Sequence, residues 1–327
     1  MMHRIEHLDS FRAIAIFMVV GIHALSYTNI ETSIYGVFEF LLTAIAVPVF
    51  FFVDGYLFSF LYKEKKFKYI KYVSKSAKRL LIPWLLFSTL YIIVRYFGEV
   101  AGYFNTRIVY ENSWYDVLYL LYSSGVSSQM YFLPALFILR LISVVMYRYL
   151  KVKLIYMCLI SVIGISLFHV FSVEKISSVS LDPFVHAIWG LQFYILGVVT
   201  EKSEGIVNNK HKLITLGLMM AGIYILSTNL MIMLQILYLY GVYYLCKWLL
   251  YHCEWLNGIG KETMGIYLLH MPFIIYGLVR LSSMFIENTS ILLLVVWLST
   301  FFTSLYISRA LTKSRIGELL FAIPGSK

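Results

Sequence analysis

Charged side chains are scarce in this sequence. Asp, Glu, Lys and Arg together account for 13% of its 327 residues, whereas soluble domains carry about 25%. Hydrophobic residues account for 60% and fall in long runs. Because a bilayer-spanning helix needs about 20 mostly apolar residues, the composition excludes an ordinary soluble enzyme. It predicts an all-α polytopic membrane protein, a bundle of transmembrane helices.

Cysteine and the signatures of several enzyme classes are also missing. The three cysteines, Cys158, Cys246 and Cys253, form no CxxC pair, which excludes a disulfide framework and a zinc site, so we expect no metal. The sequence has no GxxxxGK[ST], HExxH or GxSxG motif and no dinucleotide fingerprint. Phosphate-loop hydrolysis, zinc proteolysis and nucleotide-dependent redox chemistry therefore have no support. No small-residue cleavage site follows the first apolar segment, which predicts a retained span.

Ten apolar segments are long enough to span a bilayer, within a single membrane domain (1–327) that ends in a short tail (311–327). The predicted spans are 11–28, 34–61, 80–97, 130–147, 154–171, 184–200, 213–229, 230–250, 263–282 and 291–310. The second span contains Pro48 and Asp54, and we expect it to be tilted, kinked or locally unwound there.

Positive charge is distributed unevenly between the predicted loops. With the N-terminus inside, 22 of the 27 Lys and Arg residues fall in cytoplasmic segments and four fall outside, with Arg140 inside the fourth span. This bias predicts that both termini are cytoplasmic, because cytoplasmic loops collect Lys and Arg. The net charge of +10 is then explained by topology, and we expect membrane lipid and no nucleic acid as a partner.

Arg12 and His23 lie eleven residues apart in the first span. At about 100° per residue they share one helix face, about 16 Å apart along the axis, and Asp9 falls in the same stripe. Ionisable groups at membrane depth are costly and are functional candidates by default. We therefore predict His23 as a general base. The structural alternative is a histidine hydrogen-bonded to a neighbouring helix.

A basic segment, 63–79, carries eight positive charges and one negative charge. Such runs usually determine topology or contact anionic lipids. The functional alternative is a site for a polyphosphate donor, with Arg12, Lys78 and Arg79 as candidates. The two arginines are favoured because they sit at span boundaries and their planar side chains match phosphate.

Asp54 and His270 are two further ionisable residues inside predicted spans. Asp54 must be paired, protonated or facing water, and Arg12 is a candidate partner. His270 precedes Met271-Pro272, and the proline is expected to kink the helix beside it. A satisfied core histidine is the structural alternative for His270, and a catalytic role is the functional one.

Several weaker expectations complete the sequence reading. Glu39 is a candidate to orient His23, and the remaining polar candidates are His169, His186, Gln192 and Gln235. The segment from Trp114 to Tyr122 is expected to form an interfacial or re-entrant helix, because aromatic residues favour the headgroup zone. Ser227–Asn229 is expected to form a tight hairpin between two spans.

Five segments, in this order, carry a resemblance to a known family. They are 7–23, 47–57, 78–83, 131–136 and 265–270. The first is similar to an opening signature in which Arg and His are separated by ten residues. The second is similar to FF-x-x-S-G-Y/F, with Asp54 where serine is common. The others resemble an arginine-rich approach to a proline, W-F-L-x-x-L with Tyr131 for tryptophan, and I-Y-L-x-H ending at His270.

Together these segments resemble the integral-membrane acyltransferase family 3, a bacterial group that includes surface-polysaccharide O-acetyltransferases. The resemblance implies an acyltransferase of the bacterial plasma membrane. It would transfer an acetyl or other short acyl group from cytoplasmic acetyl-CoA or acyl-CoA to a hydroxyl of a carbohydrate or glycolipid. It implies that His23 is essential and that Arg12 and Arg79 act near the acyl-CoA. We predict Arg12, His23 and His270 as catalytic residues, and Arg12, Asp54, Lys78 and Arg79 as donor-binding residues.

The alternative from a different class is a membrane transporter or exporter of a glycan or small molecule. A broken second span and buried ions would also suit a transporter. A transporter would not need acyl-CoA, and its His23→Ala variant would lose flux without changing product acylation. A passive scaffold is disfavoured by the ionisable residues inside the spans.

Overall fold

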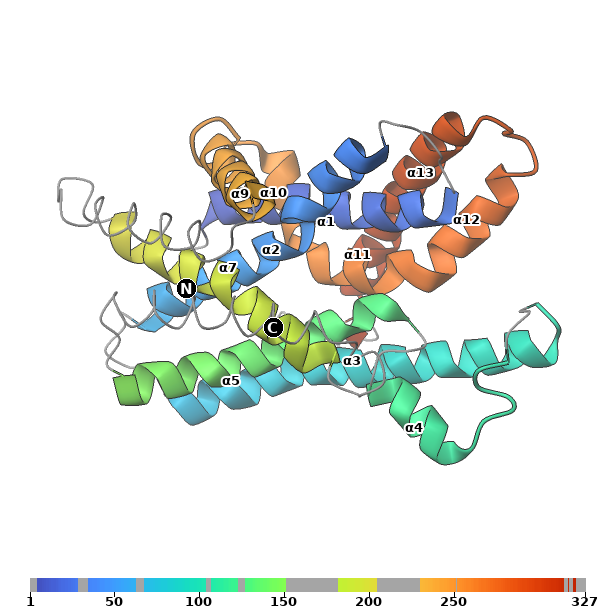
Figure 1. Cartoon of the computed structure of the whole chain (residues 1–327), viewed down its shortest axis with the longest axis horizontal. Coiled ribbons are helices and arrows are strands. Elements are labelled where there is room, and N and C mark those ends of the chain that lie inside the picture. The colour runs from blue at the N-terminus through green and yellow to red at the C-terminus, as the bar shows by residue number, and fades with distance from the viewer. Residues whose placement is uncertain are drawn as a thin grey trace. The chain divides into compact units, whose positions relative to one another are not determined.

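A computed structural model describes residues 5–28, 35–62, 68–103, 107–122, 127–150, 182–204, 230–250, 252–314, 317, 320 and 321. Within these residues every regular element is a helix (Figure 1), which confirms the predicted all-α class. The chain divides into two compact units, Met1–Tyr62 with Phe193–Ser314, and Lys63–Gln192 with Arg315–Lys327.

The first unit contains most of the described helices. They are α1 (Glu6–Thr28), α2 (Tyr35–Tyr62), α9 (Leu230–Trp248), α10 (Glu254–Lys261), α11 (Thr263–Leu269), η2 (His270–Ile274), α12 (Ile275–Ser282), α13 (Thr289–Thr312) and the second half of α7 (Asp182–Glu204). The Asn288 side chain caps α13 by accepting hydrogen bonds from the backbone of Ser290 and Ile291, a usual start for a helix.

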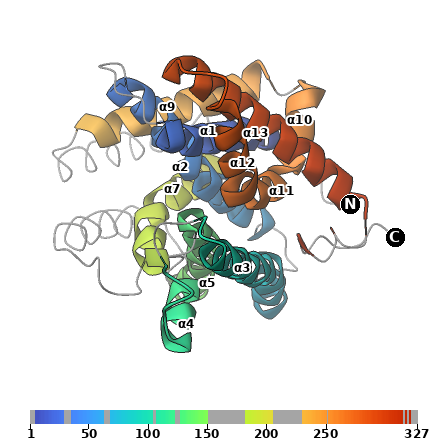
Figure 2. The same cartoon turned by 90° about the vertical axis from the view of Figure 1, so that its right-hand side faces the viewer.

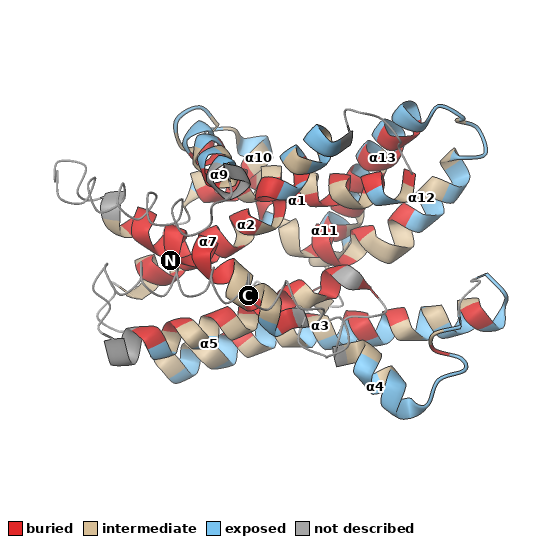
Figure 3. Cartoon of the chain, in the orientation of Figure 1, coloured by how far each residue is buried: buried red, intermediate tan, exposed pale blue. Residues whose placement is uncertain are grey.

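Helix α1 is the centre of the first unit. It packs against α2, α9, α10, α11, α12 and α13, and these helices surround it in two perpendicular views (Figures 1 and 2). Buried residues therefore occur along the whole of α1, whereas α12 and α13 carry exposed residues on their outer faces (Figure 3). Buried polar residues of α1, such as Asp9 and Ser10, are thus held inside protein, where their contacts are fixed by the surrounding helices.

The second unit is built on two long helices. Helix α3 (Tyr69–Val100) packs against α5 (Phe132–Leu150) and against the short α4 (Trp114–Tyr122). The single turn η1 (Ser128–Tyr131) leads into α5, and the first half of α7 belongs to this unit.

Seven helices among the described residues are long and apolar enough to cross a membrane. They are Glu6–Thr28, Gly36–Tyr62, Tyr69–Val100, Gln129–Met146, Pro183–Lys202, Thr263–Ser282 and Thr289–Thr312. Each overlaps one of the ten predicted spans. The predicted span at 230–250 corresponds to α9, which is helical but not among the seven. The predicted spans 154–171 and 213–229 and the Ser227–Asn229 hairpin lie outside the described residues.

Two details differ from the sequence reading. The third predicted span begins at residue 80, after the basic segment, but from Tyr69 onward the basic segment already forms the first turns of α3. Lysine and alanine are good helix formers, and nothing there breaks a helix. Helix α2 is continuous from Tyr35 to Tyr62 with Pro48 inside it, so it is not unwound at Asp54. In a buried helix, neighbouring helices can satisfy the backbone groups that a proline frees.

Candidate functional site

Two histidines from distant parts of the chain meet in the first unit. The ring centroids of His23, on α1, and His270, at the start of η2, lie 5.2 Å apart with the ring planes inclined by 45°. The His270 side chain is fully buried, and His23 is half-buried. The sequence identified each histidine separately as a mid-span candidate, and the fold brings the two together.

The hydrogen bonding of His270 defines which of its nitrogens can react. Nδ1 lies 3.0 Å from the carbonyl oxygen of Ile266. A carbonyl only accepts hydrogen bonds, so Nδ1 carries the proton in this contact and Nε2 of the neutral ring carries the lone pair. Nε2 is buried and has no hydrogen-bond partner among the described residues. It can therefore accept a hydrogen bond or a proton from a bound hydroxyl.

The helix is interrupted immediately after His270. Met271 has non-helical backbone angles (φ −133°, ψ 143°), so η2 contains a kink between α11 and α12. Pro272 has no N–H to continue the hydrogen-bond ladder, which gives the interruption its physical cause. The kink expected beside His270 is thus confirmed, and it lies within one membrane-spanning segment, Thr263–Ser282.

Contacts near the start of α1 fix the position of the His270 segment. The Ser10 hydroxyl donates to Oδ1 of Asn257 on α10 at 2.7 Å. A Cβ placed on Gly260 would lie 2.1 Å from the carbonyl oxygen of Asp9, so only glycine permits this approach. Asn257 precedes His270 by the same 13 residues that separate Ser10 from His23. The segment from α10 to η2 therefore follows α1 in the same direction.

Arg12 forms an ion pair within α1. Its Nη1 lies 3.2 Å from Oδ1 of Asp9, and the Asp9 side chain is almost fully buried while Arg12 is half-buried. Asp9 and Arg12 lie on the same face of α1 as His23, as expected from their spacing in the sequence. The Arg12 side chain is 24% exposed, and the planar guanidinium is the cation whose shape suits phosphate.

Asp54 is buried on α2 beside a very close helix crossing. A Cβ on Gly55 would lie 1.9 Å from the carbonyl oxygen of Tyr194 on α7, and a Cβ on Gly197 would lie 1.9 Å from that of Phe52. One turn further, the Ser59 hydroxyl donates to Oε2 of Glu201 at 2.7 Å. The Asp54-Gly55 segment therefore contains a structural requirement for glycine next to the carboxylate.

Lys78 and Arg79 lie on α3 in the second unit, and both side chains are exposed. Lys71 and Lys75 are exposed on the same first turns of this helix. Deeper in the unit, Nη1 of Arg140 donates to the hydroxyl of Ser76 at 3.2 Å. The start of α3 is thus an accessible cationic surface suited to phosphate groups.

The weaker candidates have other surroundings. Glu39 is exposed and makes no hydrogen bond to His23 within the described residues. Gln235 donates to the carbonyl oxygen of Ala44 at 2.8 Å and ties α9 to α2. His186 packs its ring on Tyr131, with centroids 3.8 Å apart, and Gln192 is buried. His169 lies outside the described residues.

Sequence reasoning missed several polar contacts that hold the first unit together. Asn257, Glu201 and Glu262 were not singled out, yet each receives a serine hydroxyl from another helix, Glu262 from Ser308 at 2.7 Å. Serine opposite a buried acid or amide is a common way to link helices in membranes, but the pairing of two distant positions is not visible in one sequence.

The family model of the acyltransferase domain matches residues 5–313, which include both histidines and both arginines. The chain belongs to acyltransferase family 3. Together with the apolar helices, this membership makes the protein a multi-pass membrane acyltransferase and confirms the resemblance drawn from the five segments. No curated protein and no solved structure matches the sequence.

Within this acyltransferase domain, His23 and His270 are neighbouring imidazoles, and imidazole is a side chain suited to proton transfer. No group of three or more His, Cys, Asp or Glu side chains in the described ranges is arranged to hold a metal ion. The assignment of Arg12, His23, Asp54, Lys78, Arg79 and His270 to catalysis or donor binding stays a prediction.

Proposed function

We propose that this acyltransferase moves an acetyl or other short acyl group from cytoplasmic acyl-CoA to a hydroxyl of a cell-envelope or exported carbohydrate. The observation that carries the proposal is the His23–His270 pair, with ring centroids 5.2 Å apart in the interior of the first unit. Esterification of an alcohol needs a base to remove the hydroxyl proton, and imidazole is the side chain best suited to that task near neutral pH.

The reaction assigns a defined task to each group. His23 accepts the proton of the acceptor hydroxyl while the alkoxide oxygen attacks the thioester carbonyl. The carbon–sulfur bond breaks, and the proton passes to the departing thiolate, which yields the ester and free CoA. His270 assists by accepting a hydrogen bond through the lone pair of Nε2. This nitrogen is the acceptor because Nδ1 donates its hydrogen bond to the carbonyl oxygen of Ile266. When two imidazole rings are this close, the state in which only one ring is positively charged is favoured over the state in which both are, because like charges repel.

The donor's charged end is assigned to the cationic residues. CoA carries several phosphates, and Arg side chains bind phosphate through paired N–H groups. Arg12 and Arg79, with Lys78, are the proposed contacts, all half-buried or exposed. Asp54, as an anion, would be repelled by phosphate, so its proposed contact is as a hydrogen-bond acceptor for an uncharged N–H or O–H of the donor.

The bacterial plasma membrane and a carbohydrate or glycolipid acceptor are part of the same proposal, and they rest on the family alone. Transport without chemistry, the alternative from the sequence, loses ground because the chain belongs to an acyltransferase family. The two functions make opposite predictions for the use of acyl-CoA.

The test is acyl transfer in vesicles that carry the protein. Radiolabelled acetyl-CoA is supplied with native envelope glycan, and the wild type is compared with His23→Ala. Label in the glycan with the wild type alone supports the proposal. Equal label with both proteins removes His23 from the chemistry. No label with either folded protein, with transport of the glycan still measurable, favours the transporter.

A further inference from the structure

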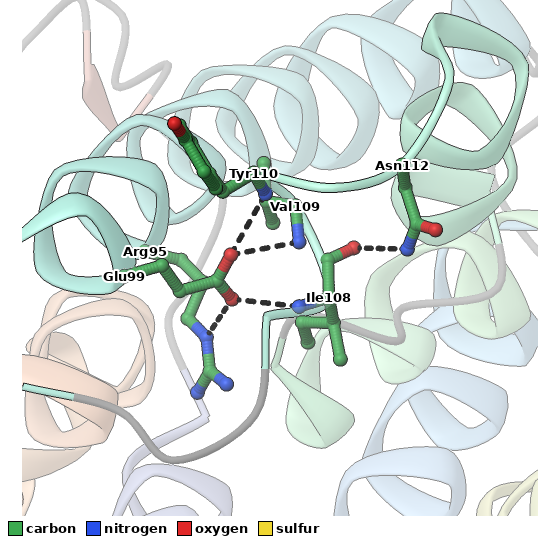
Figure 4. Close-up of polar contacts among 6 residues, drawn as sticks. All are labelled: Arg95, Glu99, Ile108, Val109, Tyr110 and Asn112. Carbon is green, nitrogen blue, oxygen red and sulfur yellow. Dashed lines mark hydrogen bonds and ion pairs between the residues drawn. The ribbon is translucent and has the colours of Figure 1, made fainter. Parts of the chain in front are cut away.

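A buried carboxylate at the far end of α3 has no part in the proposed reaction. Glu99 is 1% exposed, and Arg95 donates to its Oε1 at 2.6 Å. Three successive backbone N–H groups, those of Ile108, Val109 and Tyr110, also donate to its two oxygens at 2.8–3.0 Å (Figure 4). A carboxylate with this many donors holds a loop firmly, because each charge-assisted bond is stronger than a neutral one.

The loop held by Glu99 leads directly into α4. Asn112 donates to the carbonyl oxygen of Ile108 at 2.7 Å. The Ser113 hydroxyl and backbone N–H donate to Oδ2 of Asp116, at 2.6 and 3.1 Å. The backbone N–H of Asp116 donates back to the Ser113 hydroxyl at 3.4 Å, which makes this a reciprocal capping arrangement of the kind that starts a helix. The contacts of Glu99 with 108–110 and of Ser113 with Asp116 therefore fix where α4 begins relative to α3.

One face of α4 is aromatic and uncovered. Trp114 and Tyr115 are 62% and 67% exposed, and Leu118 and Tyr119 are exposed as well. At about 100° per residue these four side chains span an arc of about 140°. Leu120, outside this arc, and Leu121, at its edge beside Trp114, line a hollow shared with Tyr91 and Ile92 of α3.

The length of α3 puts this face near a membrane surface. Exposed Lys71, Lys75, Lys78 and Arg79 lie at the start of α3. Twenty residues separate Arg79 from Glu99, which is about 30 Å of helix and equals the thickness of the hydrocarbon core. Between them an exposed apolar stripe follows helical spacing, at Ile82, Leu86, Leu90, Ile93 and Phe97, as on a helix that faces lipid.

We infer that α4 is an interfacial anchor that lies in the lipid headgroup layer at the end of α3 remote from its lysines, and that Glu99 holds it there. Tryptophan and tyrosine prefer this layer because one end of each ring system is apolar and the other is polar. Helix α4 packs on α3, and the exposed apolar stripe of α3 is that of a helix facing lipid, which selects lipid as the occupant. This inference does not rest on the proposed reaction.

The geometry favours an interfacial position over a re-entrant one. Nine residues of helix are about 14 Å long, about half of the hydrocarbon core. Asp116 is exposed in the first turn, and an exposed carboxylate in hydrocarbon is costly. Arg107 and Glu111, paired at 2.8 Å and more than half exposed, precede the helix. Such charges are compatible with headgroups and water.

The experiment measures depth in the membrane with a fluorescent label. Cys158, Cys246 and Cys253 are replaced by serine in the full chain, and a bimane label is attached at Leu118→Cys or, as a loop control, at Glu111→Cys. Phosphatidylcholine vesicles carry nitroxides on the headgroup, near the glycerol end or near the methyl end of the acyl chain. Aqueous iodide is the fourth quencher.

We expect the label at position 118 to be quenched at least about twofold more by the headgroup and glycerol-end nitroxides than by iodide. The label at position 111 should favour iodide. Stronger quenching of position 118 by iodide would place the face in water, available to a soluble partner such as a glycan. Strongest quenching by the methyl-end nitroxide would make α4 re-entrant. Either of these results overturns the inference.

A second arm tests the role of Glu99. Glu99→Gln keeps the size of the side chain but removes its charge, which should free the loop and raise iodide quenching at position 118 at least about twofold. Arg107→Gln breaks an exposed ion pair and the contact of Arg107 over the Tyr110 ring, while every bond to Glu99 stays, so it should change nothing. Unchanged quenching in Glu99→Gln would remove Glu99 as the residue that holds α4, while the label scan in the unaltered chain still decides the position of the helix.

Discussion

The Ser10 hydroxyl donates to the side-chain oxygen of Asn257 at 2.7 Å, and each of these residues lies 13 positions before one histidine of the central pair. Equal lengths of chain therefore connect one fixed contact to the other. Because α10 and α11 follow α1 in the same direction, the Ser10–Asn257 contact sets the position along α1 at which His270 lies beside His23. The histidine pair is thus a consequence of how α1 is packed, and not of local sequence.

Substitution of His23 tests the proposed base. His23→Ala should lower acyl transfer by about 10²–10⁴-fold, the usual worth of a positioned acid–base group. The measurement is the initial rate of ester formation from labelled acetyl-CoA. His252→Ala is the matched control, since this histidine is exposed in the turn before α10, and its rate should equal the wild type. A rate for His23→Ala within about threefold of the control would refute the assignment.

Substitution of His270 separates a chemical role from a structural one. In His270→Asn the amide can occupy the position of Nδ1 and keep the bond to Ile266, but nothing accepts at the position of Nε2. In His270→Gln an oxygen can accept near that position. We expect the turnover of the Asn variant to fall about 10²-fold and that of the Gln variant about 10-fold or less.

A purely structural histidine would give the reverse order, since the Asn variant retains the Ile266 contact. The melting temperature of both variants in detergent is the companion measurement. If turnover follows the melting temperature across the two variants, His270 acts through packing and not through Nε2.

The Arg12–Asp9 pair permits a test of donor binding. Arg12→Gln should raise the KM for acyl-CoA about 10–100-fold, the equivalent of about 1.5–3 kcal/mol for lost charge-assisted hydrogen bonds. The change also leaves the buried Asp9 carboxylate without this ion-pair partner. The double variant Asp9→Asn, Arg12→Gln removes that second effect. A KM restored to the wild-type value in the double variant would contradict a contact between Arg12 and the donor.

Structural features that depend on neighbouring residues could be predicted from the sequence, whereas contacts between distant segments could not. The spans are local properties of composition, so each of the seven described helices that are long and apolar enough to cross a membrane overlaps a predicted span. The interruption beside His270 was also local, because proline lacks the N–H that a helix needs. The helical start of α3 was missed because charge density was read as loop, although lysine is a good helix former.

The site shows the opposite limit. His23 and His270 were both selected, since a histidine in an apolar span stands out by itself. That they lie beside each other, and that Ile266 selects the tautomer of His270, depends on packing between segments 247 residues apart. Asn257 and Gly260 gave no signal at all, because an asparagine and a glycine near a short helix are common. Only the position of α1 shows what they contact.

The crossing of α2 and α7 gives a prediction for stability. In Gly55→Ala the new Cβ would lie 1.9 Å from the carbonyl oxygen of Tyr194, and a backbone atom cannot move aside as a flexible side chain can. We expect the free energy of unfolding to fall by about 3 kcal/mol, at the upper end of the cost of overpacking. The measurement is the melting temperature of the purified protein in detergent.

Two further variants make that test specific. Gly197→Ala meets the carbonyl oxygen of Phe52 at 1.9 Å at the same crossing, so the two substitutions together should cost less than the sum of each alone, because one separation of the helices relieves both clashes. Gly241→Ala on α9 is the control, with nothing within 4 Å of the new Cβ. It should leave the melting temperature unchanged or raise it, because alanine is the better helix former by about 1 kcal/mol. Equal melting temperatures for Gly55→Ala and Gly241→Ala would show that α2 and α7 do not cross this closely in the folded protein.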